Sequence, residues 1–160
     1  ALTPLGLITE ERVPQEGPKG GKQFTYVDIG SIDNNTKRIV EPKTLPVTKA
    51  PSRAKQNLKA GDVLVSMTRP NLNAVALVPR ELDGAVGSTG FHVLRAKEVE
   101  VSWLFYAVQT NDFVDAMCRL VQGALYPAVR PKDIRAHKVS FPSLDAQRQI
   151  VAEIETESSQ

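Results

Sequence analysis

The sequence predicts an α+β domain in which a twisted sheet of mixed or antiparallel strands is covered by a helical layer and followed by a C-terminal helix. Two observations lead to this fold class. Short β-branched and aromatic segments, separated by Gly, Pro and Asn clusters, recur between residues 24 and 94. Apolar residues at helical spacing then fill one block between residues 102 and 121. The 160 residues, of which 41% are hydrophobic and 24% charged, are enough for one globular domain.

The N-terminal part of the chain lacks the patterns of regular structure. We expect residues 1–23 to form a flexible N-terminal connection, because Gly, Pro and charged residues crowd its second half. The first strand is expected at residues 24–29, where aromatic and β-branched side chains alternate with others before Gly30. Residues 42–59 contain three prolines and many basic or amide side chains, so we interpret them as an exposed, irregular excursion.

The central strands and the helical block have clearer signals. Residues 63–67 and 74–78 are rich in β-branched side chains and flank a short loop, so they predict an antiparallel pair. The helical block begins at Ser102, and the cluster at residues 110–112 divides it into two helices, the second capped by Asn111 or Asp112. Further strands are expected at residues 85–86, 91–94 and 138–141.

A last helix is expected to begin after Pro142, because proline cannot extend a sheet ladder and Ser143 can cap free helix amides. Side chains at three- to four-residue spacing form one stripe of this helix: Leu144, Gln147, Ile150, Val151 and Ile154. The stripe predicts packing against another helix or subunit. No Gly or Pro stop precedes Gln160, so we expect residues 143–160 to be the truncated start of a longer helix.

Positive charge is concentrated in two segments, although the whole chain carries only +2. Residues 35–80 hold nine basic and two acidic side chains, and residues 119–138 hold five basic and one acidic. Together these segments can form a positive face that attracts a phosphate backbone. The alternative is that these side chains belong to solvated loops around strands.

Residue patterns of catalytic and metal sites are missing from the sequence. It contains no phosphate-binding glycine loop, dinucleotide fingerprint or zinc spacing, and the soft ligands are limited to Cys118, His92 and His137. We therefore expect no catalytic residue, no metal and no enzyme activity. No apolar run approaches the roughly 20 residues of a membrane span, and the single cysteine cannot form an internal disulfide, so we expect a cytoplasmic protein.

One loop has residue types suited to base recognition. Arginine can donate two hydrogen bonds to guanine, and asparagine can pair in the same way with adenine. Arg69, Asn71 and Asn73 lie in the loop between two predicted strands, and Pro70 stiffens it. They are our first base-contacting candidates. The alternative is that the asparagines only close a hairpin.

Several ordered segments resemble one protein family. The sequence Phe-Pro-Ser-Leu-Asp-Ala-Gln-Arg-Gln-Ile-Val at residues 141–151 is similar to the junction between a target recognition domain and the conserved spacer helix in specificity subunits of type I restriction-modification systems. Residues 61–66, 87–95, 102–106 with Phe113, and 123–134 resemble other parts of that domain in the same order. The resemblance covers roughly residues 24–154.

The resemblance implies a target recognition domain over residues 24–142 that reads one half of a bipartite site in double-stranded DNA. A second recognition domain, or a second copy, would be held at a distance by paired spacer helices. Methylation and cleavage would belong to separate modification and restriction subunits, which would use S-adenosylmethionine, ATP and Mg²⁺, so this chain would carry no cofactor.

The same resemblance places a second loop, residues 122–132, near DNA. It adds Tyr126 and Arg130 as base-contacting candidates, although Tyr126 could equally lie at the rim of the core. Basic residues with less defined surroundings are predicted to contact phosphates: Lys19, Lys22, Arg53, Lys55 and Lys132. Two other functions stay open, a recognition domain within a single-chain restriction and methyltransferase fusion and a protein-interaction module whose basic face is incidental.

Overall fold

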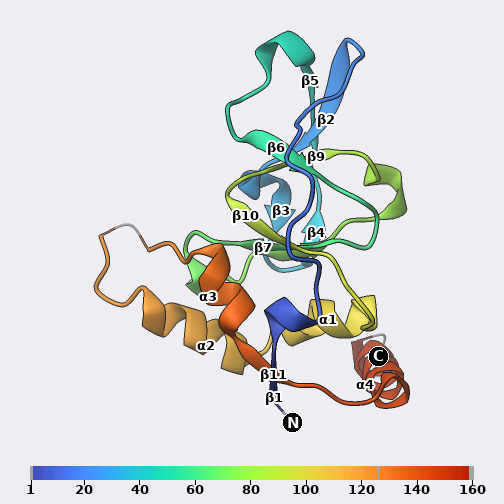
Figure 1. Cartoon of the computed structure of the whole chain (residues 1–160), viewed down its shortest axis with the longest axis vertical. Helices are drawn as coiled ribbons and strands as arrows, with labels where there is room; N and C mark the ends of the chain where they lie inside the picture. The colour runs from blue at the N-terminus through green and yellow to red at the C-terminus, as the bar shows by residue number, and fades with distance from the viewer. Residues whose placement is uncertain (1, 126, 159–160) are drawn as a thin grey trace.

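The computed structural model describes residues 2–125 and 127–158, and the predicted α+β class is confirmed. Figure 1 shows most strands in the upper and middle parts of the molecule and the α-helices in the lower part. The helices are α1 (Val101–Ala107), α2 (Asn111–Leu120), α3 (Pro131–Ala136) and α4 (Leu144–Ser158). The strands are β1 (Leu2–Pro4), β2 (Gln23–Val27), β3 (Ile32–Asp33), β4 (Arg38–Ile39), β5 (Lys43–Pro46), β6 (Ala54–Asn57), β7 (Val63–Ser66), β8 (Val75–Leu77), β9 (Val86–Ser88), β10 (Phe91–Leu94) and β11 (Lys138–Ser140).

Two larger sheets make up the β part. The strand order is β10-β7-β8 in an antiparallel three-stranded sheet and β5-β2-β9-β6 in a four-stranded sheet, where only β2 and β9 run parallel. The sheet is therefore mixed, as expected. The predicted pair at 63–67 and 74–78 forms as β7 and β8, with Val63 opposite Leu77.

Strand β7 divides the hydrophobic core in two. Successive side chains of a strand point to opposite faces. Val63 and Val65 accordingly belong to the cluster that includes helix residues such as Leu104. Leu64, between them, belongs to a second cluster with Phe91. Because both faces of β7 are buried, this strand is the rigid centre from which the neighbouring loops extend.

The N-terminal segment differs from the expectation of a flexible connection before residue 24. Strand β1 pairs antiparallel with β11, and Leu5, Ile8 and Val13 are buried in the core. Glu10 N–H also donates to the Arg95 carbonyl at 2.8 Å. Three apolar side chains spaced irregularly among Gly, Pro and charged residues have no periodicity, so the sequence pattern did not reveal that they are buried.

Gly17 locks this segment onto β6. Its N–H donates to the Lys55 carbonyl at 2.9 Å, and Asn57 Nδ2 donates back to the Gly17 carbonyl at 2.8 Å. Gly17 has φ +75°, and a Cβ at this position would lie 2.9 Å from the Ala54 carbonyl oxygen. No side chain can be added there without moving the backbone of β6.

We therefore expect Gly17→Ala to lower the free energy of unfolding by at least about 2 kcal/mol, measured by urea titration. Gly20→Ala is the matched control, because Gly20 has φ +61° but a Cβ added there would meet no heavy atom within 4 Å. It should cost only the left-handed backbone penalty of about 1 kcal/mol. Equal losses in the two variants would contradict the close packing of Gly17 against Ala54.

Two other segments also differ from expectation. Residues 42–59 are not an irregular excursion, because they supply β5 and β6, which flank β2 and β9 in the four-stranded sheet. The loop before the last strand contains an unexpected helix, α3, with Pro131 in its first turn and the Asp133 carboxylate accepting from Arg130 N–H at 2.8 Å. Six residues are too few to show helical periodicity.

The split of the helical block into α1 and α2 agrees with the prediction, but the second cap does not. Thr110 caps α2, and its Oγ1 accepts from Phe113 N–H at 3.2 Å. The last helix, α4, begins at Leu144 close to the expected position, after the Ser143 hydroxyl that accepts from Ala146 N–H at 3.2 Å.

Candidate nucleic-acid interface

The loop between β7 and β8 has a constrained backbone. Pro70–Leu72 form a 3-10 turn flanked by Arg69 and Asn73, whose φ angles are +47° and +49°. Leu72 N–H and Asn73 N–H donate to the carbonyls of Arg69 and Pro70, each at 3.0 Å. Left-handed backbone at residues other than glycine costs free energy and concentrates at functional sites. The loop therefore holds Arg69 and Asn71, which are both exposed, in one defined frame.

Asn73 has a structural role in this loop. Its carbonyl accepts a 2.6 Å hydrogen bond from Lys37 Nζ, and its Nδ2 donates to the Gln109 carbonyl at 3.4 Å. Burial also lowers the pKa of Lys37. Asn73 thus links three segments, which are the β3–β4 hairpin, the β7–β8 loop and the turn before α2. Of the three predicted base contacts here, Asn73 already uses its side chain within the protein.

The second predicted loop lies directly beside the first. Arg69 N–H donates to the Pro127 carbonyl at 2.9 Å, and Val129 N–H donates to the Met67 carbonyl at 2.8 Å. Between them, Thr68 and Ala128 form an isolated antiparallel bridge. The segments 67–69 and 127–129 therefore form one unit, which we call the paired loops. Tyr126, a predicted base contact, lies outside the described residues.

Exposed basic side chains follow this bridge. Arg130 is 68% exposed at the start of α3, and its Nε lies 3.7 Å from the Asp133 carboxylate. Lys132 is exposed on the first turn of α3. The separation is long and the Arg130 side chain is solvated, so Asp133 leaves most of the attraction of Arg130 for an anion in place. The paired loops thus bring the segment that carries Arg69 and Asn71 next to the segment that carries Arg130 and Lys132.

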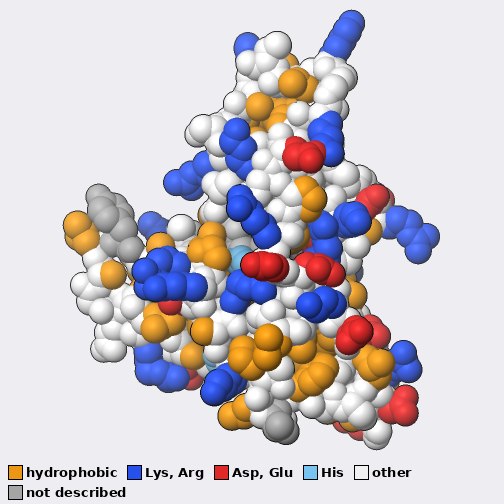
Figure 2. Space-filling view, viewed as in Figure 1, with side chains coloured by type: hydrophobic (Ala, Val, Ile, Leu, Met, Phe, Trp, Pro, Cys, Tyr) orange, Lys and Arg blue, Asp and Glu red, His pale blue; other side chains and the backbone are white. Residues whose placement is uncertain are grey.

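The predicted phosphate contacts lie mainly in the upper β lobe, formed by β2, β5 and β6. Lys22, Arg53 and Lys55 are exposed there. Arg53 shares a hollow of about 450 Å³ with Lys43, Lys49 and Asp28, and Lys43 Nζ lies 3.9 Å from the Asp28 carboxylate. Figure 2 shows Lys and Arg side chains over this lobe and over α3, with acidic side chains between them. Both regions present cations on the face shown.

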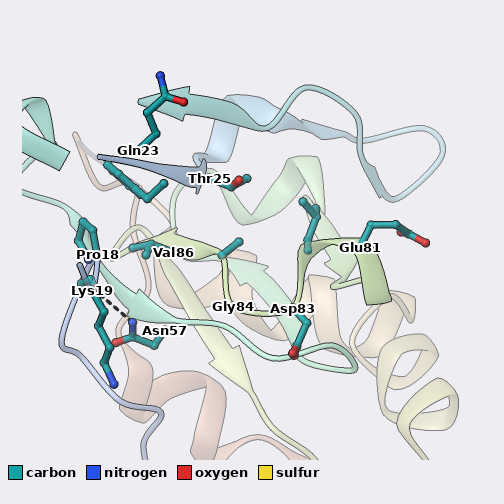
Figure 3. A pocket seen from close by; sticks show the side chains of 13 residues that line it. Pro18, Lys19, Gln23, Thr25, Asn57, Glu81, Asp83, Gly84 and Val86 are labelled. Atoms are coloured by element: carbon teal, nitrogen blue, oxygen red, sulfur yellow. Dashed lines mark hydrogen bonds between the residues drawn. The ribbon is translucent and has the colours of Figure 1, made fainter. Parts of the chain in front are cut away.

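Lys19 is a weaker candidate than the others. It forms an ion pair with the exposed Glu16. It also lines a hollow of about 400 Å³ that contains Glu81 and Asp83 (Figure 3). In that view Lys19 lies beside Asn57, on the side of the hollow away from Glu81. Carboxylates in the same hollow reduce its attraction for a phosphate.

The stripe of α4 is used partly within the domain. Gln147 is 0% exposed, and Val151 packs against the main core cluster. Leu144 and Ile150 stay 44% and 38% exposed. Ile150 and Ile154 line a hollow of about 360 Å³ together with Trp103 of α1. Part of the predicted stripe therefore packs within the domain itself, and its packing against another helix or subunit stays a prediction.

Both histidines are half-buried, and burial lowers the pKa of each. Burial, with a smaller contribution from Arg135, lowers the pKa of His92 to about 4, so its imidazole is neutral at pH 7. His137 Nε2 lies 3.5 Å from the Asp112 carboxylate, and the His137 ring packs edge-on against Phe113. Burial lowers the pKa of His137 more than Asp112 raises it.

The described residues bear on two other kinds of site. No three His, Cys, Asp or Glu side chains there are arranged to hold a metal, and none of the helices has the length and apolar character of a membrane span.

Sequence reasoning missed Lys37 as a loop-positioning residue. Its contact with Asn73 joins positions far apart in the chain, and nothing in the local sequence signals it.

The fold and the paired loops define a scaffold domain that presents cationic, amide-bearing loops from the end of a buried strand. Comparison with known proteins identifies its family. The chain belongs to the type I restriction modification DNA specificity domain family, which matches residues 11–157.

Individual relatives agree with this assignment. The HindI specificity subunit of a type I restriction enzyme from Haemophilus influenzae is 24% identical over 130 residues, which are 79% of this chain and 28% of that protein. The HsdS subunit from Thermoanaerobacter tengcongensis is 36% identical with a TM-score of 0.86, over 98% of this chain and 41% of the other. A chain from a structural study of complex assembly and conformational transition in the type I R-M system is 35% identical with a TM-score of 0.92, over 99% and 42%. This chain spans less than half the length of these relatives.

Proposed function

We propose that this domain recognises one half of a bipartite DNA site as part of a type I specificity subunit. The observation that carries the proposal is the backbone pairing of residues 67–69 with 127–129. It gathers Arg69, Asn71 and Arg130 on one rigid frame, and base recognition requires such side chains on firmly held loops. Membership of the specificity domain family supports the same function.

The candidate DNA-contacting residues divide into two roles in this proposal. Arg69 and Asn71 contact base edges, with Arg130 beside them, whereas Lys22, Arg53, Lys55 and Lys132 contact phosphates and set the position of the duplex. Lys19 contributes less because of Glu16.

Catalysis belongs to other subunits in this proposal. A modification subunit methylates the DNA with S-adenosylmethionine, and a restriction subunit cleaves it with ATP and Mg²⁺. Helix α4 connects this domain to a second recognition domain, or a second copy, through paired spacer helices. Leu144 and Ile150, still exposed on α4, are available for those contacts.

The phosphate assignment is tested by Arg53→Ala and Lys55→Ala in the specificity subunit that contains this domain. Each variant should weaken binding to all DNA sequences alike and reduce the slope of log K against log salt by about 0.9 for each lost phosphate contact. Fluorescence anisotropy over a salt series measures this.

Lys138→Ala is the matched control. Lys138 is an exposed lysine of β11, which lies at the opposite end of the molecule from the upper β lobe (Figure 1), and its loss should leave the salt slope unchanged. Salt-insensitive binding by the unmodified subunit would count against DNA recognition itself.

A further inference from the structure

Gln147 forms a polar joint where α4 leaves the domain. The side chain is 0% exposed, and both ends of its amide are used. Its Oε1 accepts from Glu100 N–H at 2.9 Å, and its Nε2 donates to the Pro142 carbonyl at 2.8 Å. Glu100 is the residue that caps α1. One side chain therefore ties together α4, the start of α1 and the segment that follows β11.

The surroundings of Gln147 make this joint rigid. The Trp103 ring of α1 packs edge-on against Phe141 with ring centroids 6.1 Å apart, and Val151 packs against the main core one turn further along α4. A buried amide is costly unless its partners are in place, so it permits few alternative arrangements of the helices around it. Gln149, two residues further, is exposed, and its Nε2 donates to Glu153 Oε1 of the same helix at 3.4 Å.

We propose that Gln147 is a positioning residue that fixes the direction of α4 and thereby sets the gap between half-sites that the specificity subunit accepts. This inference rests on the proposed function, in which α4 connects two recognition domains. From Gln147 to its last residue, Ser158, α4 extends about 16 Å. A tilt of about 15° at the joint moves the far end by about 4 Å, which exceeds the roughly 3.4 Å between neighbouring base pairs. A change of this size in the direction of α4 therefore corresponds to about one base pair in the gap.

The test uses the full specificity subunit assembled with its modification subunit. Initial methylation rates are compared on duplexes whose half-sites are separated by the native gap, by one base pair more and by one base pair fewer. In Gln147→Leu, which keeps the bulk but removes both amide bonds, the preference for the native gap should fall about 25-fold, because each of the two lost hydrogen bonds corresponds to about fivefold. The bases preferred within each half-site should stay the same.

Gln149→Leu is the matched control, because it makes the same change on the exposed side of α4 and should leave the gap preference unchanged. Gln147→Asn, which keeps the amide but is one methylene shorter, serves as the second variant if Gln147→Leu fails to fold. An unchanged gap preference in a folded Gln147 variant, even with a lower melting temperature, would overturn the inference while leaving DNA recognition intact. Methylation by the unmodified complex that depends on neither bases nor gap would overturn the proposed function as well.

Discussion

Replacing Arg69 with alanine is expected to change which DNA sequence is methylated by a complex that contains this domain. The side chain is exposed, while its backbone is held by the hydrogen bond from its N–H to the Pro127 carbonyl. A guanidinium on a fixed loop can donate two hydrogen bonds to one guanine, which contributes about 1–3 kcal/mol of discrimination. Its loss should therefore relax the preference at one base pair by about 5- to 150-fold, measured by methylome sequencing.

Asn71→Ala extends the test to the second exposed side chain of the loop, where an adenine preference should be lost. The matched control is Arg80→Ala, because Arg80 is also exposed but lies on a different 3-10 turn, Arg80–Leu82. Sequence preference that survives both Arg69→Ala and Asn71→Ala would show that the β7–β8 loop does not contact bases. A uniform loss over all sequences would instead assign Arg69 to a phosphate.

The predicted specificity depends on the fixed position of the loop. Left-handed backbone at Arg69 and Asn73 would relax in an isolated hairpin, because it costs about 1–3 kcal/mol per residue. Here it is held by Lys37 on one side and by residues 127–129 on the other. A loop that is already ordered loses little entropy when it meets DNA, so more of its contact energy appears as discrimination.

The sequence was informative where local chemistry determines structure. Strands β7 and β10 are mostly apolar segments beside turn residues, and α1, α2 and α4 have helical spacing, so their type could be predicted. Strand β5, with Lys43 and Pro46 at its ends, has a polar sequence, and it exists because β2 provides its hydrogen bonds. The burial of Leu5 likewise depends on α3, which was itself too short to predict.

The candidate interface was predictable as residue types but not as an arrangement. Arg69 was identified from its residue type and loop position and Arg130 from the family resemblance, yet the bridge between Thr68 and Ala128 joins segments that are distant in sequence. The side chains of Asn71 and Asn73 look equivalent in the sequence. The contacts of Asn73 with Lys37 and Gln109 separate a structural asparagine from an exposed one. Long-range hydrogen bonds therefore decide which candidates remain available for DNA.

The largest effect on stability is expected for Asp62→Ala, in the turn before β7. Asp62 is 1% exposed, and its carboxylate accepts from Arg95 Nε at 2.8 Å and Arg95 Nη2 at 2.9 Å. The same carboxylate accepts from Lys59 N–H at 2.8 Å. Hydrogen bonding to Asp62 raises the pKa of Arg95, which stays positively charged. Removing the carboxylate leaves that cation largely buried without its counter-charge, and breaking such a pair costs about 3–5 kcal/mol.

Urea titration of the unfolding free energy measures this loss, with Asp115→Ala as the matched control, because Asp115 is exposed on α2. A double variant, Asp62→Ala with Arg95→Met, isolates the pair. Since it removes the cation together with its partner, it should lose clearly less stability than the sum of the two single variants. Additive losses would mean that the two side chains stabilise the fold independently. The turn before β7 would then be stabilised by its backbone and by the hydrogen bond from Lys59 N–H to Asp62, rather than by the ion pair.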